Sequence, residues 1–483
     1  MTQRNKLILI LLTFVAVGAF FRLWYLEPGL HFAADEVRDL TLIQESWESG
    51  SIPLLGPELR GTGLHYGPFF YHLLTLPYVV TDFSPVAGAL VVAIIAILTI
   101  LLVYAVGKMY FSPLAGLIAA GLYSIAPLVI HHSRWAWNPN PLPFFVLLVL
   151  IGIGILRRTQ NAFIQRLSIL LIAISLGISI QLHLSALVLF ALVVVAWPLF
   201  KLPRPKWSDI LLGIGVIVIL LLPLALFEMT EGGNIAKTET LTEVYGDTSL
   251  FERLFSDVPV MWFGAFGDLV IPGLPVIISA ALFIMLVGLF LFLKVAPKDE
   301  KNKPLKIFFI SWLIILFVGL TFSEVLVRYY FIGFFPWPFL VLGAVIASMK
   351  KHFRPFLIVL IITVFVLFAG IRLGTYFTNI KQGGADEYLV TQETMHKVTD
   401  YILSASNGRP YTLEVIRRYE YGSAYEFFLH KTENHPSIDA NQTFMVMQPI
   451  DIDFEFSDEA TNYQQIDERI FGNTRVIHLE KTL

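Results

Sequence analysis

Long runs of uncharged, apolar residues dominate this 483-residue chain and constrain its fold more than any other feature. A helix needs about 20 apolar residues to cross the hydrocarbon core of a bilayer, and several of the runs are close to that length. The composition agrees: 56% of the residues are hydrophobic and 15% are charged, whereas ordinary soluble domains have about 25% charged residues. The sequence therefore predicts an all-α polytopic membrane domain.

Eleven apolar segments are expected to span the membrane. The fourth, fifth and sixth are short or closely joined, so we expect them to tilt or to re-enter without crossing completely. The first follows Arg4 and Lys6 like a signal peptide, but no small-residue cleavage site follows it, so we expect an uncleaved first span. The segments are residues 7–26, 85–107, 113–130, 142–156, 167–181, 184–200, 209–227, 271–293, 306–321, 331–348 and 355–375.

Basic residues lie mainly on one side of these spans. With the N-terminus inside, the outer loops before the tail contain only Arg38, Arg60, Arg134, Lys237, Arg253 and Arg328, and the inner loops contain far more Lys and Arg. The positive-inside rule therefore predicts a cytoplasmic N-terminus. Because the number of spans is odd, the C-terminal tail is expected on the extracytoplasmic side of the cytoplasmic membrane.

The composition changes to that of a soluble domain near residue 376. We therefore divide the chain into a transmembrane domain, residues 1–376, and a small extracytoplasmic α/β domain, residues 377–483. Its predicted elements are a helix at 386–405 and strands at 411–416, 443–447 and 474–479. In the first outer loop, residues 36–48 and 68–80 are predicted to form helices that lie along the interface.

Two functional classes are disfavoured by composition. The net charge of −3 indicates no nucleic-acid partner. The absence of cysteine excludes disulfides, thiol catalysis and thiolate metal sites.

The segment His31–Asp39, directly after the first span, contains the adjacent carboxylates Asp35 and Glu36. A carboxylate near lipid costs several kcal/mol unless it is paired. We interpret Asp35, with Glu36, as the chemical centre of a membrane-embedded transferase. The structural alternative is that Asp35 caps a surface helix that ends before Gly50, and both can hold together.

Further ionisable and aromatic residues lie at the outer ends of other spans. Arg134 and Asn138 belong to the loop His131–Pro141, where an Arg can bind phosphate through two oxygens or can anchor the interface together with Trp. His183 lies in a short connection where most isolated histidines are structural. Arg253 lies in the long loop 228–270, and Arg328 with Tyr329 precede the tenth span.

The spans themselves carry almost no charge, while carboxylates, His and Arg gather at their outer ends. A proton-coupled transporter more often has ionisable groups at mid-membrane. This arrangement favours an active site at the outer interface, within reach of a lipid-linked substrate.

In order along the chain, these motifs resemble the GT-C superfamily of membrane glycosyltransferases. The resemblance is to the branch with the dolichyl-phosphate-mannose protein mannosyltransferases and the bacterial aminoarabinose transferase that acts on lipid A, and it covers about residues 5–350. Four motifs carry it: Ala34-Asp35-Glu36 after the first span, His65-Tyr66-Gly67-Pro68 followed by aromatics, Ser133-Arg134 with Asn138-Pro139, and Arg328-Tyr329-Tyr330 with Pro336. In the second motif, Gly67 replaces the first Pro that is usual in the family.

The resemblance implies an inverting, mannosyltransferase-like enzyme of the cell envelope. It implies a polyprenyl-phosphate sugar donor, an unidentified hydroxyl acceptor (protein, lipid or glycan) and membrane lipid as partners, without a cofactor or metal. Asp35 would be the general base, and Glu36 would hold substrate or orient Asp35. Arg134, Arg328 and Arg253 are the expected phosphate ligands, and His65, Tyr66, His183, Asn138 and Tyr329 the expected substrate-binding residues.

Two alternatives remain open. The first is a transporter of lipid-linked glycans, which would need charged or discontinuous elements at membrane depth. The second is a non-catalytic partner protein, or an enzyme that handles undecaprenyl-pyrophosphate glycans, such as a polysaccharide ligase or polymerase. Such enzymes also place Arg residues outside but do not usually have an Asp-Glu pair after the first span.

Overall fold

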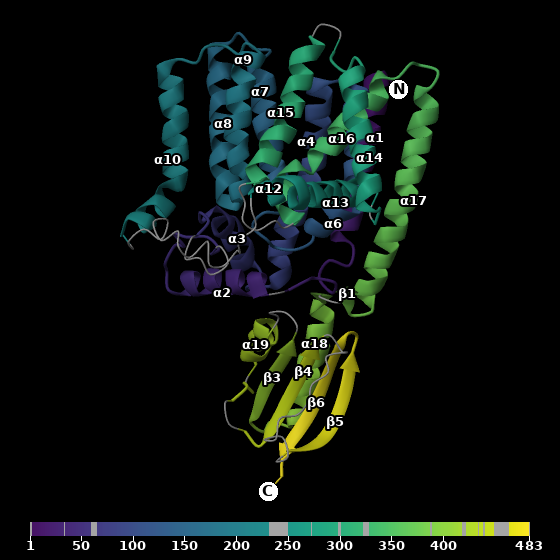
Figure 1. Cartoon of the computed structure of the whole chain (residues 1–483). Helices are drawn as coiled ribbons and strands as arrows, with labels where there is room; N and C mark the ends of the chain where they lie inside the picture. Colours follow the sequence, from purple (N-terminus) through teal and green to yellow (C-terminus); the bar gives the residue numbers. More distant parts are fainter. Residues whose placement is uncertain are drawn as a thin grey trace.

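The computed structural model consists of a helical bundle and a small sheet-containing domain at one end of it (Figure 1). The N-terminus lies at the far end of the bundle from that domain. We call the end of the bundle that faces the sheet the domain side. The structure describes residues 2–32, 34–58, 65–230, 250–271, 273–297, 301–321, 328–386, 389–417, 422–432, 434–437, 440–448 and 463–482.

Each of the eleven predicted spans contains a helix, so the predicted fold class is confirmed. Within the described residues, seven helices are long and apolar enough to cross a membrane, and shorter apolar helices occupy the remaining predicted spans. The bundle helices are α1 (Gln3–Leu23), α4 (Pro85–Tyr110), α5 (Pro113–Ser124), α7 (Leu142–Leu156), α8 (Ala162–Leu182), α9 (Val188–Leu199), α10 (Trp207–Thr230), α14 (Val276–Phe292), α15 (Asn302–Thr321), α16 (Pro336–Ser348) and α17 (Arg354–Lys381).

The sequence specifies where several of these helices begin. Pro85, Pro113 and Pro336 occupy the first turns of α4, α5 and α16, where proline lacks only an N–H that would have no helical partner. Ser112 caps α5, because its hydroxyl accepts a hydrogen bond from the backbone N–H of Ala115 at 3.1 Å. These signals separate consecutive apolar runs into distinct helices.

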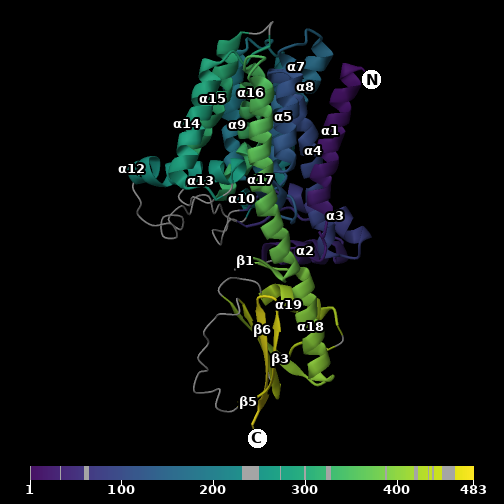
Figure 2. The ribbon, with the colours of Figure 1, turned by 90° about the vertical axis from the view of Figure 1, so that its right-hand side faces the viewer.

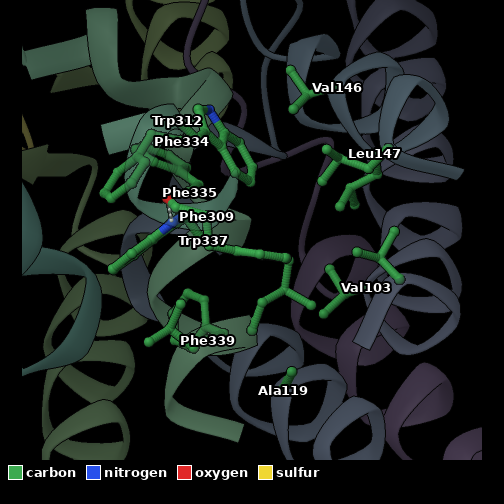
Figure 3. Close-up of a cluster of buried hydrophobic side chains, with 14 of the residues drawn as sticks. Val103, Ala119, Val146, Leu147, Phe309, Trp312, Phe334, Phe335, Trp337 and Phe339 are labelled. Carbon is green, nitrogen blue, oxygen red and sulfur yellow. Dashed lines mark hydrogen bonds between the residues drawn. The ribbon is translucent and has the colours of Figure 1, made fainter. Parts of the chain in front are cut away.

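Large aromatic side chains fill the centre of the bundle, where Figure 3 shows Trp312, Phe334 and Trp337 among aliphatic neighbours from other helices. The buried indole N–H of Trp337 donates to the carbonyl oxygen of Phe309 at 2.9 Å (Figure 3). This bond satisfies a polar group that would otherwise be costly to bury. The core therefore fixes α16 against α15.

Short helices form a layer at the domain side, where α2 and α13 lie across the bundle axis (Figure 1). Residues predicted as interfacial helices form α2 and α3. The α13 helix, in a loop without a predicted element, was missed. The layer contains α2 (Ala34–Glu48), α3 (Phe69–Val80), α6 (Pro127–His132), the 3-10 turns η1 (Leu184–Leu187) and η4 (Arg328–Phe334), α12 (Leu250–Glu252), the π-helical turn η3 (Arg253–Asp257) and α13 (Val258–Val270).

The C-terminal sheet has the strand order β3-β4-β6-β5, with β3 and β4 parallel and the other neighbours antiparallel. The three predicted strands are present, whereas β5 and α19 were not predicted. The elements are β1 (Gly384–Asp386), β2 (Leu389–Val390), α18 (Gln392–Ser406), β3 (Tyr411–Arg417), α19 (Gly422–His430), β4 (Gln442–Gln448), β5 (Tyr463–Phe471) and β6 (Thr474–Lys481).

The predicted helix at 386–405 begins later than expected, at Gln392. Thr391 is its N-cap and accepts a hydrogen bond from the backbone N–H of Thr394, while Gly384 to Asp386 pair with β2 instead. Figure 2 shows α17 continuing from the bundle into this domain.

Candidate active site

The two adjacent carboxylates of the first outer loop lie in different surroundings. Both are in the first turn of α2, where the helix dipole favours negative charge. The side chain of Asp35 is 47% exposed, and its Oδ1 lies 2.8 Å from Nη1 of Arg38. Glu36 is 2% exposed, and its Oε2 lies 3.1 Å from Nδ1 of His31. Only Asp35 is therefore open to a second molecule.

A third carboxylate on the same helix was missed from the sequence. Asp39 is buried, and its Oδ1 accepts hydrogen bonds from Nη2 of Arg38 at 2.7 Å and from the hydroxyl of Tyr71 at 2.9 Å. Burial raises the pKa of Asp39 to about 7, although Arg38 and Tyr71 oppose the rise. Asp35, Arg38 and Asp39 follow an i, i+3, i+4 spacing, which places them on one face of a helix and could have predicted this cluster. Because Tyr71 belongs to α3, Asp39 joins α2 to α3.

A continuous row of aromatic rings leads away from His31. The ring of His31 lies 4.9 Å from Trp135, which stacks on Trp137 at 4.6 Å and 15°. Trp137 contacts Tyr329 at 4.5 Å. Tyr329 in turn lies 5.6 Å from His183, and His183 stacks on Tyr66 at 5.8 Å. We call Tyr66, Trp135, Trp137, His183 and Tyr329 the aromatic wall. It brings together residues from four loops that are far apart in the sequence.

The imidazole of His183 offers a hydrogen-bond donor inside this wall. Its Nδ1 accepts from the backbone N–H of Ser185 at 3.1 Å, so the neutral ring carries its proton on Nε2. His183 is 4% exposed, and Nε2 has no hydrogen-bond partner among the described residues. Burial lowers the pKa of His183 to about 4, which keeps the ring neutral at pH 7.

The segment before α3 is held against α8. The amide oxygen of Gln181 accepts from the backbone N–H of Phe69 at 3.1 Å. A Cβ at Gly67 would lie 2.3 Å from Cγ of Gln181, so only glycine fits there. The neighbouring His65 packs at 5.5 Å on Phe227 of α10, and Tyr66 exchanges backbone hydrogen bonds with Gly56 and Pro57. Tyr66, a member of the aromatic wall, and the adjacent His65 therefore have fixed positions.

The guanidinium of Arg134, a predicted phosphate ligand, lies among backbone carbonyl groups. Its Nη1 donates to the carbonyl oxygens of Phe21 at 3.0 Å, Arg22 at 3.1 Å and Trp24 at 2.9 Å, and its Nη2 to that of Tyr25 at 2.9 Å. These are carbonyls at the C-terminal end of α1, where a cation is favoured. Arg134 is 2% exposed.

The other predicted residues differ in how far they can be placed. Asn138 is buried and donates to the carbonyl oxygen of Leu182 at 2.7 Å, which supports the connection that carries His183. Arg253 is half-buried in η3, within the domain-side layer. The backbone of Arg328 begins η4, but its side chain lies outside the described part of the structure. Tyr329 belongs to the aromatic wall.

No group of three or more His, Asp or Glu side chains that could hold a metal ion occurs among the described residues. That the enzyme works without a metal remains a prediction.

Comparison with known proteins shows the fold of the chain and gives a family match for part of it. Residues 7–231 match the family model described as dolichyl-phosphate-mannose-protein mannosyltransferase. A search of curated proteins gives no match.

Two solved proteins share the architecture. ArnT from Cupriavidus metallidurans, in a crystal structure bound to undecaprenyl phosphate, superposes with a TM-score of 0.62 at 13% identity, over 99% of this chain and 98% of that one. The oligosaccharyltransferase of Archaeoglobus fulgidus, in the apo form, gives a TM-score of 0.53 at 12% identity, over 88% of this chain and 64% of that one.

These likenesses agree with the arrangement described above: a helical bundle, a layer of short helices and a small domain at one end. The protein is a multi-pass membrane protein. Residues 7–231 match the family model of the dolichyl-phosphate-mannose-protein mannosyltransferases, and the chain as a whole shares the fold of ArnT.

Proposed function

We propose that this protein transfers a sugar from a polyprenyl-phosphate donor to a hydroxyl acceptor on the outer face of the cytoplasmic membrane. The N-terminus then lies in the cytoplasm and the C-terminal domain outside, as the distribution of basic residues predicts. The donor class is supported by the family match and by the undecaprenyl phosphate bound to ArnT, whose fold this chain shares.

The single observation that carries the proposal is the contrast between Asp35 and Glu36. A general base must reach the acceptor hydroxyl, and Asp35 is half exposed at the membrane edge, whereas Glu36 is buried against His31. We therefore assign Asp35 as the base and Glu36 as the residue that positions the loop through His31. Arg38 holds the Asp35 carboxylate from one side and leaves its other oxygen for the acceptor.

The proposed reaction is a single displacement with inversion. The acceptor oxygen attacks the anomeric carbon, the bond from that carbon to the phosphate oxygen breaks, and the proton of the acceptor passes to Asp35. The electron pair of the broken bond leaves with the polyprenyl phosphate. A positioned carboxylate contributes about 10²–10⁴-fold to such a step, and a fixed cation stabilises the negative charge that develops on the leaving phosphate.

The aromatic wall is the proposed surface for the transferred sugar. Aromatic faces suit the apolar faces of a pyranose or furanose ring. We keep His183 as a substrate-binding candidate because its Nε2–H is a buried donor without a hydrogen-bond partner among the described residues. His65, next to Tyr66, extends this surface. Asn138 acts indirectly, because its amide supports Leu182, next to His183.

For the leaving phosphate we retain Arg253 and Arg328 as candidates. Arg134 is not retained, because its two terminal nitrogens already donate to four carbonyl groups. We propose that Arg134 stabilises the end of α1 and thereby the segment that leads to Asp35.

The test is transfer by the purified protein in nanodiscs. Synthetic polyprenyl phosphates, each with a different tritiated sugar, are incubated with extracts of acceptor lipids, glycans and membrane proteins. The proposal predicts labelled product together with released polyprenyl phosphate. Movement of intact labelled lipid across vesicles, without a covalent change, would instead favour the transporter alternative.

A further inference from the structure

A groove runs between α1 and α17 on the outside of the bundle. Its volume is about 390 Å³, and its lining includes Phe21 of α1, Trp24 directly after α1, and Gly370, Gly374 and Phe377 of α17. The rings of Phe21 and Trp24 contact Phe377 at 6.3 and 4.8 Å. None of these residues belongs to the candidate active site.

The groove is open because two glycines leave space in α17. A Cβ built at Gly370 or at Gly374 would have no neighbouring atom within 4 Å. In the most apolar stretch of each helix, only 17% of α17 and 11% of α1 is buried within the protein. In Figure 1, α17 stands at the edge of the bundle. The groove therefore faces the hydrocarbon that surrounds the helices.

A cation lies at the domain-side end of this groove. Lys381 occupies the last turn of α17, and its Nζ is 4.7 Å from the centroid of the Trp24 ring and 6.0 Å from that of Tyr25. In the described part of the chain, Lys381 forms no ion pair. Glu393, which accepts a hydrogen bond from the hydroxyl of Tyr25, also pairs with Nζ of Lys397. Trp, Tyr and Lys side chains are typically found at the depth of the lipid headgroups in a membrane.

We propose that this groove binds one glycerophospholipid with an anionic headgroup. One acyl chain lies over Gly370 and Gly374 between the two helices, and the phosphate lies at Lys381. Lys381 lies 11 positions after Gly370, a rise of about 16 Å along the helix, which suits a chain of about a dozen methylenes. The lipid would fill the space between α1, which precedes the candidate catalytic loop, and α17, which carries the C-terminal domain.

Charge decides between lipid classes. An anionic lipid gains the attraction of Lys381, worth about 1 kcal/mol near the surface, which corresponds to about a 5-fold difference in affinity. A zwitterionic lipid of the same chain length offers only the apolar contact. We therefore expect phosphatidylglycerol to be retained several-fold better than phosphatidylcholine.

The experiment measures lipid retained by the purified full-length protein, by native mass spectrometry after exchange into detergent with equal amounts of both lipids. Two variants act at opposite ends of the groove: Lys381→Glu reverses the exposed charge, and Gly374→Leu fills the apolar part. Lys351→Glu, an exposed lysine before the other end of α17, is the matched control.

The proposal predicts that the wild type and Lys351→Glu retain phosphatidylglycerol equally. It also predicts that Lys381→Glu retains at least 5-fold less phosphatidylglycerol than the wild type, and that Gly374→Leu retains neither lipid. Equal retention of the two lipids by the wild type, or unchanged retention in Lys381→Glu, would overturn the proposal. Because Lys381 is exposed and not part of the core, we expect Lys381→Glu to fold. This variant therefore tests the proposal even if Gly374→Leu fails to fold. Sugar transfer is not measured, so the result is independent of the proposed function.

Discussion

Nδ1 of His31 lies 3.1 Å from Oε2 of Glu36, and this buried contact separates Glu36 from the half-exposed Asp35 beside it. Two carboxylates that are adjacent in sequence therefore have different partners. Glu36 faces the protein interior, where it fixes the loop after α1. Asp35 faces outward, where a substrate can reach it.

This separation predicts different kinetics for variants of the buried pair. Glu36→Gln and His31→Gln should each lower kcat/KM about 10-fold, because the loop loses its position while Asp35 remains. The double variant should be little worse than either single one, since residues in direct contact couple in a double-mutant cycle. Fully additive losses would mean that His31 and Glu36 act separately.

Arg134 should matter for stability more than for catalysis. Arg134→Met removes the donors for four carbonyl oxygens and should lower the free energy of unfolding by about 3 kcal/mol, because each buried acceptor loses its partner. Thermal unfolding in detergent measures this loss. Arg253→Met, in contrast, should keep the melting temperature within a few degrees and lower transfer. Normal stability together with lost donor binding in Arg134→Met would restore its assignment to the phosphate.

Buried histidines should make the protein sensitive to acid. Burial lowers the pKa of His183 and of His132 to about 4, below the value of 6.5 for an exposed imidazole. Between pH 4 and 6.5 the unfolded chain therefore binds more protons than the folded one, so stability is fully present above pH 6.5 and is lost as the pH falls. Each group contributes a slope of about 1.4 kcal/mol per pH unit in this range.

His183→Gln tests this assignment, because glutamine keeps a donor but does not titrate. Its melting temperature should fall less steeply between pH 6.5 and 4.5 than that of the wild type, and at pH 7.5 its kcat should stay within about 10-fold. His183→Ala should lose more activity at pH 7.5, since no donor remains. Identical pH profiles of the wild type and His183→Gln would show that His183 is not the titrating group.

The C-terminal domain should hold the candidate catalytic loop in place. The backbone N–H groups of Gln392 and Glu393, in the first turn of α18, donate to the carbonyl oxygens of Leu30 at 2.9 Å and Pro28 at 3.1 Å. The hydroxyl of Tyr25 also bonds to the carboxylate of Glu393. This contact satisfies two donors at a helix start, so the loop before Asp35 and α18 form one unit.

Tyr25→Phe should therefore raise hydrogen exchange in residues 25–32 and 389–395 several-fold, because it removes one bond between the loop and α18. Tyr401→Phe is the control, since Tyr401 bonds to Asp467 within the C-terminal domain. Faster exchange confined to the domain, with an unchanged loop, would contradict this account of the contact.

The sequence predicted the fold class well because apolar runs are local signals. It missed α13, although Val258, Trp262, Phe266 and Leu269 follow a helical spacing and are buried, because the preceding acidic segment obscured the pattern. The β5 strand was missed because its residues are mostly polar and only partly buried.

The candidate site was predictable only in part. The loops that form the aromatic wall were predicted, because aromatic and ionisable side chains cluster at span ends. The contacts of Arg134 could not be predicted. Its acceptors are backbone carbonyls more than 100 residues earlier in the chain, and backbone carbonyls are present at every residue whatever its type. Nor could spacing tell which of Asp35 and Glu36 faces inward, since that depends on the position of His31.

The most direct test of the account is the rate of sugar transfer by Asp35→Asn, measured beside Asp82→Asn, an exposed acid in the turn after α3. The account predicts that Asp35→Asn lowers kcat by about 10²–10⁴-fold, with unchanged expression, melting temperature and donor binding, and that Asp82→Asn behaves like the wild type. Full transfer activity in Asp35→Asn would contradict the assignment of Asp35 as the base.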